Sequence, residues 1–379
     1  MKFTIEKREL SSLTTTVHRA ASNKNTIPVL SGLLLQLDKE KGLTMTATDM
    51  EIGIKASTQN VEILQEGQVL VNANYFADFI KLLPDTLISL ELNHETSKLN
   101  ISYGRSSGNI NIYSDQEYPG LPINKIDHIF YMSQKILKEA LKKTVFAAAV
   151  NHFRQVFTGV VFDILENNII KIVASDTHRM AYYSYTLDQE EIEPFKFVIP
   201  IRTVNELLRF LDDTNEPINI ALSSNNVLFY KDEFIFLSRL IEGQYPNYEQ
   251  VIPANLITTV HLKTNTLANA LERAKIMPTD DKFKIQHVQF SFDGEEACLH
   301  SYSEAMGEIS EVIEDIELEG DKEVKIAFNT NYFLDVIKIF AQECDTVSIQ
   351  LSGPMGPAII KNPEKEQYLY VLVPLRTNN

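Results

Sequence analysis

The sequence contains no tryptophan and only two cysteines among its 379 residues. Cys298 and Cys344 have no ligand-like spacing, so they indicate neither a zinc site nor a disulfide framework. A reducing cytoplasm is therefore the expected compartment. No apolar run approaches the roughly 18 residues that a membrane helix needs. The first residues, Met1 to Glu6, become polar too early for a secretory signal peptide. We expect a cytoplasmic protein that makes no membrane contact.

Motifs for phosphate binding and catalysis are also missing. The sequence has neither a P-loop nor the glycine-rich dinucleotide fingerprint, and its eight histidines show no metal-ligand spacing. Asp212-Asp213 and Asp280-Asp281 could hold a metal, but both lie beside turn-forming residues, where solvated carboxylates are commoner. His178, close to Asp176 and Ser175, suggests a hydrolase or nuclease, yet triad members meet through the fold and not at this spacing. A binding protein with no cofactor and no metal is favoured over an enzyme.

Charge is plentiful but unevenly distributed. The formal net charge is −16, which taken alone argues against nucleic acid. Residues 304–323 contain nine acids and one lysine, whereas residues 134–150 contain four lysines and one glutamate. The lysines are either an ordinary solvated helix face or a basic field on an acidic body, and the pattern alone leaves both open.

The sequence also repeats itself. Asp49 and Asp176 end closely similar hairpins 127 positions apart, and Tyr118-Pro119 recurs at the same interval as Tyr245-Pro246. Residues 72–76 reappear 257 positions later as residues 329–333. A period this long indicates that a whole domain was copied. We predict three domains, at residues 1–125, 126–252 and 253–379.

Each repeat contains two amphipathic helices that interrupt runs of strands. Apolar residues at helical spacing predict a first helix in each repeat, over about 10–20, 137–148 and 267–274. A second helix in each is expected at about 75–83, 204–211 and 332–341. Every domain therefore consists of two strand–helix–strands halves, and the fold class is α+β.

Several segments carry a resemblance to one family. They are Met1 to Thr4, Thr26 to Leu35, Ala47 to Glu51, Ala174 to Ala181, Gly243 to Tyr248, Phe328 to Val336 and Val373 to Arg376. In this order, over the whole chain, the sequence resembles the bacterial sliding clamp family, the β subunits of DNA polymerase III. The resemblance implies three sliding-clamp domains per chain and a head-to-tail homodimer. Two such chains would close a six-domain ring around double-stranded DNA, with helices lining the hole and sheets outside.

The resemblance also implies contacts with DNA that are weak, sequence-independent and topological. The implied DNA-binding residues are Lys24, Lys135, Lys138, Lys142, Arg154 and Arg202, with Lys143 also facing the phosphates. For each one the alternative is an ordinary surface cation. Asn74 stands where some relatives have a basic residue. The implied dimer contacts are Ile110 and Ile112 on an edge strand, and Ile276 and Met277 at the end of a helix.

A hydrophobic pocket for partner proteins is the third implication. The replicative DNA polymerase, the clamp loader and repair proteins would insert short peptides with Gln, Leu and Phe anchors. The matching positions are Phe157, Ser175, Thr177, His178, Arg179, Met180, Pro246, Val251, Val371, Val373, Pro374, Leu375 and Arg376. We expect His178 and Arg179 to lie at the groove's rim. Thr177 replaces a common Gly, and Thr377 to Asn379 extend past the usual ending. Besides a non-catalytic processivity clamp, a hydrolase and a generic interaction scaffold remain as alternatives.

Overall fold

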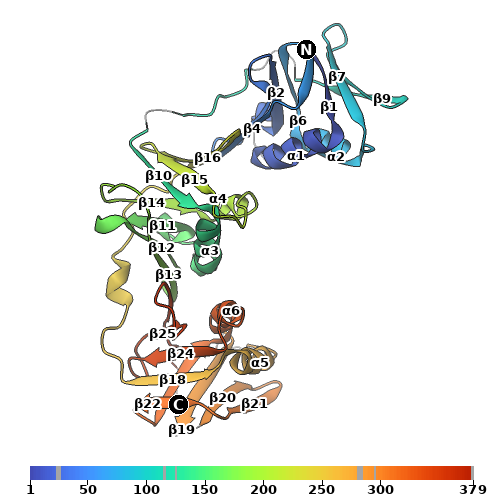
Figure 1. The fold of residues 1–379 in the computed structure, drawn as a ribbon. Helices are drawn as coiled ribbons and strands as arrows, with labels where there is room; N and C mark the ends of the chain where they lie inside the picture. Colours follow the sequence, from blue (N-terminus) through green and yellow to red (C-terminus); the bar gives the residue numbers. More distant parts are fainter. Residues whose placement is uncertain (23–26, 114–116, 124–125, 280–284, 294–295, 377–379) are drawn as a thin grey trace. The chain divides into compact units, whose positions relative to one another are not determined.

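The computed structural model describes residues 1–22, 27–113, 117–123, 126–279, 285–293 and 296–376. The chain forms two compact units, which are described separately (Figure 1). The first unit contains Met1–Lys138 and Asn205–Leu240, and the second contains Glu139–Val204 and Ile241–Asn379. The second sequence repeat is therefore divided between the two units. None of the helices in the described ranges is long and apolar enough to cross a membrane.

The described part of the chain contains six α-helices. They are α1 Lys7–Val17, α2 Ala73–Leu82, α3 Gln134–Thr144, α4 Ile201–Leu207, α5 Thr264–Ala274 and α6 Thr330–Phe340. The start of α2 is set by the Asn72 side chain, which accepts a hydrogen bond from the amide of Tyr75. Asn329 likewise accepts bonds from the amides of Asn331 and Tyr332 at the start of α6. Such caps satisfy amides that have no partner inside the helix.

The expected bounds of some helices were wrong. Helix α4 begins three residues earlier than predicted and ends at Leu207, although Leu211 is buried. Residues 209–211 form hydrogen-bonded turns instead. The first helices of the first two repeats end at Val17 and Thr144 and continue as short 3₁₀ turns. Apolar spacing marks which residues are buried, and a turn can bury them as well as a helix.

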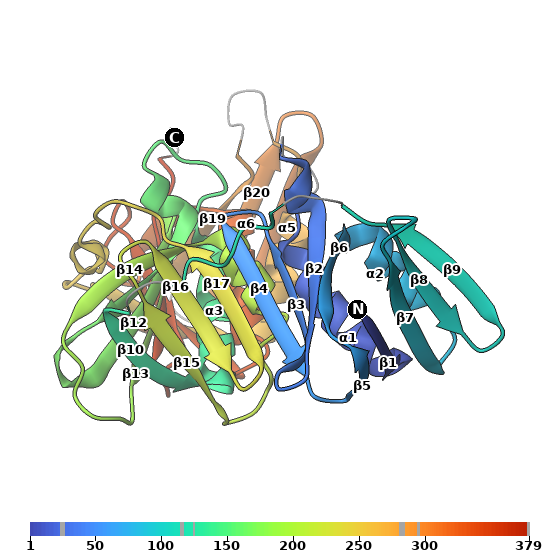
Figure 2. The same cartoon turned by 90° about the horizontal axis from the view of Figure 1, so that it is seen from above.

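The first unit contains two antiparallel sheets. In spatial order, one is β5 Val61–Gln65, β1 Lys2–Glu6, β7 Leu87–Asn93, β8 Lys98–Tyr103 and β9 Ser106–Asn111. The other is β10 His128–Ser133, β15 Pro217–Leu222, β16 Asn226–Lys231, β17 Phe234–Arg239, β4 Ile52–Thr58, β3 Gly42–Thr48, β2 Gly32–Asp38 and β6 Gly67–Asn72. Figure 2 shows β16, β17, β4 and β3 side by side. The β17–β4 pair joins the second repeat to the first.

The second unit also contains two antiparallel sheets. The larger is β14 Phe195–Pro200, β11 Gly159–Ile164, β12 Ile169–Ser175, β13 Arg179–Thr186, β26 Tyr368–Leu372, β25 Ala358–Lys361, β24 Thr346–Leu351, β18 Thr258–Lys263 and β22 Glu317–Gly320. The smaller is β21 Gly307–Ile313, β20 Glu296–Ser303, β19 His287–Asp293 and β23 Val324–Asn329. Here the β13–β26 pair joins the second repeat to the third.

Each large sheet has a helix face and a linker face. In the first unit α1 packs on β3 and β4, and the Thr14 hydroxyl contacts the Met45 sulfur. Strand residues alternate in direction, so the neighbours of Met45 in sequence point away from α1. On that opposite face the linker after β9 is held by Tyr118, whose hydroxyl accepts a bond from the Thr48 amide (2.8 Å) and donates to the Gly32 carbonyl (3.2 Å).

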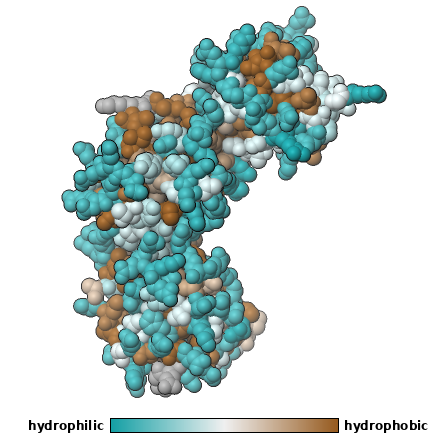
Figure 3. All heavy atoms as spheres, in the orientation of Figure 1, coloured by the Kyte–Doolittle hydropathy of each residue, from teal (hydrophilic) through white to brown (hydrophobic). Residues whose placement is uncertain are grey.

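The surface is mixed. On the face drawn in Figure 3, hydrophilic side chains cover much of each unit, and hydrophobic residues form separate patches. Isolated exposed apolar residues are normal for globular proteins, whereas contiguous patches mark interaction sites. A binding site is therefore expected where several apolar residues lie together.

Candidate functional site

Three of the predicted pocket residues meet on the linker face of the nine-stranded sheet. Met180 on β13 lies opposite Val371 on β26, and Phe157 packs in the same cluster. Met180 and Val371 are each 2% exposed. Tyr245 belongs to the cluster too, and its ring lies 5.7 Å from that of Phe157. The walls expected for a peptide groove are therefore closely packed against one another.

More exposed pocket residues surround this cluster. Val251 and Val373 are exposed apolar residues, Pro246, Pro374 and Leu375 are half-buried, and Arg376 is exposed. The amide of Val373 donates to the His178 carbonyl (3.0 Å), and that of Leu375 donates to the Ala327 carbonyl (2.7 Å). Backbone bonds thus hold the C-terminal segment at the edge of the cluster. An apolar centre with a partly polar rim is the usual composition of a recognition site.

The segment that carries Pro246 and Val251 is fixed by a buried polar pair. The Tyr248 hydroxyl donates to Asp163 Oδ2 (2.6 Å), and the Lys196 ammonium lies 2.7 Å from the same oxygen. Burial, followed by the bond to Asp163, raises the pKa of Tyr248 above its usual value. Lys171 pairs with Glu249 on the same segment. These residues were missed in the sequence, where Asp163 and Tyr248 were only parts of matching segments.

Arg179 was expected at the rim of the groove, but it lies on the helix face of the sheet. Its guanidinium donates to Asp176 Oδ2 (3.0 Å), Asp335 Oδ2 (2.8 Å) and the Phe146 carbonyl (2.6 Å). Burial alone would lower the pKa of this group, but Tyr370 and the two carboxylates raise the pKa above its ordinary value. The cause is strand alternation, because neighbours on β13 point to opposite faces. Met180 therefore faces the cluster and Arg179 faces α6.

The turn between β12 and β13 is hydrogen-bonded internally. The Ser175 hydroxyl donates to the Arg179 carbonyl (2.8 Å), and Asp176 Oδ1 accepts the amides of His178 and Arg179 (both 3.0 Å). Two of the three would-be triad members, Ser175 and Asp176, are thus bonded to Arg179, which gives no support to a hydrolase. Thr177 has φ of +75°, a left-handed conformation that is unfavourable for a β-branched residue and suits glycine. The exposed His178 follows it.

A loop beside the cluster exposes large apolar side chains. Phe153 is 88% exposed, and the His152 ring lies 4.5 Å from the Phe153 ring and 4.8 Å from that of Phe157. The exposed Arg154 guanidinium lies 5.9 Å from the Phe157 ring centre. Arg154, predicted to contact DNA, is therefore also adjacent to the proposed pocket.

The lysines of α3 do not all have the same environment. Lys135 and Lys142 are exposed, whereas Lys138 pairs with Asp213 at 3.0 Å. The expectation that Lys143 faces phosphates was wrong. Its side chain is 9% exposed, and its ammonium lies 2.7 Å from both Glu139 and Glu343. A lysine enclosed by two carboxylates is a structural contact and not a DNA contact.

The remaining predicted residues are distributed as follows. Arg202 on α4 is exposed and Asn74 on α2 is half-buried. Asp212 forms an ion pair with Lys231 (2.8 Å), and Asp213 forms one with Lys138. Both aspartates are therefore engaged in ion pairs. No cluster of metal-ligand residues occurs within the described ranges. Lys24, Asp280-Asp281 and Thr377 to Asn379 lie outside the described residues.

The predicted dimer residues differ in accessibility. β9 is the edge strand of its sheet, but Ile110 is buried within its own unit, opposite Leu99 on β8. Ile112 is half-buried beside Val71. Ile276 is 75% exposed and Met277 half-buried, both just beyond the end of α5 and not inside it. Val312 on the edge strand β21 is an exposed apolar residue that sequence reasoning missed.

The chain is similar to known proteins over nearly its whole length. Three family models match the chain: the DNA polymerase III beta subunit N-terminal domain over residues 1–122, its central domain over 131–247 and its C-terminal domain over 249–376. Among curated proteins, the beta sliding clamp of Halalkalibacterium halodurans is 32% identical and that of Bacillus subtilis 29% identical, and each alignment covers 100% of both chains.

Solved structures agree over the full length. The DNA polymerase sliding clamp from Bacillus subtilis matches with a TM-score of 0.92 at 29% identity, and the beta subunit from Streptococcus pyogenes with 0.93 at 26%. A sliding clamp from Pseudomonas aeruginosa bound to griselimycin matches with 0.91 at 25%. In all three cases 100% of both chains is covered.

Proposed function

The chain belongs to the family of DNA polymerase III beta subunits, the bacterial sliding clamps, and we propose that it encircles duplex DNA as a homodimer. It is a DNA replication processivity clamp and not an enzyme, as the family is non-catalytic. The observation that carries this function is the threefold repeat matched, domain by domain, over its whole length. The ring would tether the replicative polymerase and other clamp-binding proteins to the template.

The choice of strands that pair between neighbouring repeats follows a rule, and this rule supports a head-to-tail ring. The third strand after the first helix of repeat 1, β4, pairs with β17, and the third strand after the first helix of repeat 2, β13, pairs with β26. In repeat 3 the equivalent strand is β21, and the strand equivalent to β17 and β26 in repeat 1 is β9. Both are edge strands of their sheets. Pairing β9 of one protomer with β21 of its partner extends the rule and closes a symmetric dimer.

For DNA contact we propose Lys135, Lys138 and Lys142 on α3, together with Arg154 and Arg202. The ammonium group of lysine and the guanidinium group of arginine bind phosphates without reading bases. Binding is therefore sequence-independent and permits sliding. Lys24 remains part of the same proposal. Partner peptides with Gln, Leu and Phe anchors would bind at the Met180–Val371 cluster, where Val251, Val373 and Leu375 supply exposed apolar surface.

Two further assignments accompany this function. We propose domain boundaries at 125/126 and 252/253, inside the segments that link the repeats, and a location in the cytoplasm, where replication takes place. No cofactor is required for a ring that acts by topology.

Retention on DNA tests the proposal directly. Clamp loaded by a matched clamp loader onto nicked circular DNA should stay bound during gel filtration, and linearising that DNA should release it. Equal retention on both forms would contradict a topological ring. Processive synthesis with the cognate polymerase separates a working clamp from a scaffold that has only the fold.

A further inference from the structure

The two junctions between repeats present matching rows of residues on their linker faces. In the second unit the row runs through paired positions Gln350, Ile359, Val371, Met180 and Ser175. In the first unit the paired positions are Ala221, Leu228, Leu237, Gly53 and Thr48. Gly53 thus stands where Met180 stands, and Leu237 where Val371 stands. The first junction contains an apolar row in the same place as the proposed partner pocket.

At the first junction this row is already covered by the chain itself. Leu121, from the linker after β9, packs against Ala221, Leu228 and Leu237. A Cβ atom built on Gly53 would lie 2.3 Å from Leu121 Cδ2, so the leucine occupies the space that a side chain at position 53 would need. Glycine at 53 and leucine at 121 are therefore matched to each other.

The equivalent linker residue of the second junction also belongs to the cluster of Met180 and Val371, but its hydroxyl is held by a strand residue outside the row. Leu121 corresponds to Tyr248 at the 127-residue interval, and Tyr248 is hydrogen-bonded to Asp163 on β11. In the first repeat Gln36 stands at the position of Asp163, and its amide donates to the Gln68 side chain (3.3 Å). At the first junction the residue equivalent to Asp163 is therefore a glutamine bonded to another strand, and the linker residue Leu121 packs on the row.

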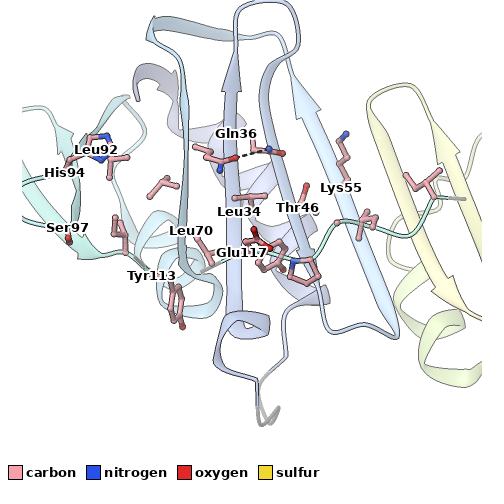
Figure 4. Close-up of a pocket in the computed structure, with 18 residues that line it drawn as sticks. Leu34, Gln36, Thr46, Lys55, Leu70, Leu92, His94, Ser97, Tyr113 and Glu117 are labelled. Carbon is pink, nitrogen blue, oxygen red and sulfur yellow. Dashed lines mark hydrogen bonds between the residues drawn. The ribbon is translucent and has the colours of Figure 1, made fainter. Parts of the chain in front are cut away.

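An open groove of about 1070 Å³ lies next to Leu121. Apolar Leu34 and Leu70 and polar Gln36, Gln68 and Lys55 line it, as does the linker itself from Glu117 to Leu121. In Figure 4 the linker passes over the strands beside Leu34 and Glu117. Apolar walls with a few amide groups suit an extended peptide that has an apolar anchor and glutamine.

We propose that Leu121 is a built-in anchor, which occupies at the first junction the place that a partner's apolar anchor takes at the second. The groove beside it is a latent second binding site for peptides of the Gln/Leu/Phe class. Leu121 thereby restricts partner binding to one junction in each protomer. The inference rests on the proposed partner pocket, since it assigns the same ligand class to both rows.

Calorimetric titration of the full-length protein with one synthetic Gln/Leu/Phe peptide tests this. Wild type should bind one peptide per protomer, and Leu121→Ala should bind two. Met180→Ala should bind none, while Met180→Ala combined with Leu121→Ala should regain one site. Ile123→Ala, an exposed neighbour on the same linker and groove, is the matched control and should keep the wild-type stoichiometry.

The outcomes separate this inference from the proposed pocket. If Leu121→Ala still binds one peptide and the double variant binds none, Leu121 covers no latent site. If wild type binds none but Leu121→Ala gains a site, the pocket at the second junction is misplaced and the latent site stands. Should Leu121→Ala fail to melt cooperatively, Leu121→Val replaces it: a second site, even a weaker one, supports the inference, and stoichiometry of one overturns it.

Discussion

The guanidinium of Arg179 is stacked on the ring of Tyr332, with its central carbon 4.1 Å from the ring centre. The contact joins β13 of the second repeat to α6 of the third. The same guanidinium donates to Asp335 on that helix. Arg179 therefore connects the two repeats from the face opposite to the proposed pocket.

Replacing Arg179 by alanine should reduce the free energy of unfolding by about 2 kcal/mol, because charge-assisted bonds to Asp176 and Asp335 are lost. Arg179→Lys should recover only part of this, since an ammonium cannot reproduce the fork of the guanidinium. Urea unfolding measures the free energy of unfolding of both variants. Arg154→Ala, at an exposed position, is the control, with an expected change within about 0.5 kcal/mol. Equal effects at the two arginines would refute the structural role of Arg179.

Removing the Met180 side chain should abolish partner-peptide binding. The wild-type affinity is expected on the order of micromolar, since the gain from apolar anchors is partly offset by ordering the peptide. Met180→Ala should raise Kd beyond the range of the titration, by at least about a hundredfold, which corresponds to about 2.8 kcal/mol. Deletion of residues 373–379 should have a similar effect, by removal of the exposed rim. Fluorescence anisotropy with a labelled peptide measures both.

Leu237→Ala is the matched control for Met180→Ala, because Leu237 lies in the equivalent row of the first unit. It should leave peptide affinity unchanged. Unaltered affinity in Met180→Ala, with a folded ring, would mean that the peptide binds elsewhere.

Removing two exposed lysines of α3 should weaken DNA binding in a salt-dependent way. For Lys135→Ala with Lys142→Ala, the slope of log K against log salt should decrease by about two, since each phosphate contact contributes about 0.9. Binding to a short duplex over a range of salt concentrations measures the slope. Lys143→Ala should leave the slope unchanged but lower the melting temperature, because it leaves Glu139 and Glu343 without their cation. A reduced slope in Lys143→Ala would contradict its structural role.

Charges at the exposed end of α5 should separate the dimer. Ile276→Glu with Met277→Glu is expected to yield folded monomers at micromolar concentration, as measured by sedimentation velocity. Met355→Glu, a comparably exposed apolar residue in a turn, should remain dimeric. Ile110→Glu should instead unfold the first unit, since that side chain is buried. A dimeric Ile276/Met277 variant would remove these residues from the interface.

Stability at alkaline pH should depend on Tyr118. Burial raises the pKa of Tyr118 to about 12, whereas the pKa of a tyrosine in an unfolded chain is about 10. The folded state keeps its proton longer, so this stabilisation is complete below pH of about 10 and is lost as pH rises toward about 12. Tyr118→Phe should cost about 1 kcal/mol at neutral pH, because two hydrogen bonds are lost. The difference from wild type should shrink above pH of about 10 in urea unfolding; a constant difference would argue against the shift.

The sequence predicts the two helices of each repeat because buried positions recur at helical spacing. The caps at Asn72 and Asn329 are equally local, as each side chain bonds amides two or three residues away. The predicted sites depend on more distant contacts. Lys142 and Lys143 are adjacent in sequence, but Lys143 is enclosed by Glu139 and by Glu343, and the second of these lies far along the chain.

The direction of a side chain on a strand was the second feature that the sequence did not predict. The sequence places Arg179 and Met180 in one motif, but the pleat sends them to opposite faces. The pairing of β4 with β17 and of β13 with β26 was also not predictable, because no periodicity within a strand identifies which edge it will meet.

The β13–β26 pair has a consequence for synthesis of the chain. Strand β13 ends at Thr186, but its partner begins at Tyr368, close to the C-terminus. During translation the first half of repeat 2 has to wait for nearly all of repeat 3 to leave the ribosome before its sheet is complete. An exposed strand edge in a nascent chain invites pairing with other chains. The interval between these two strands is therefore a stage of synthesis at which a chaperone would protect the nascent chain.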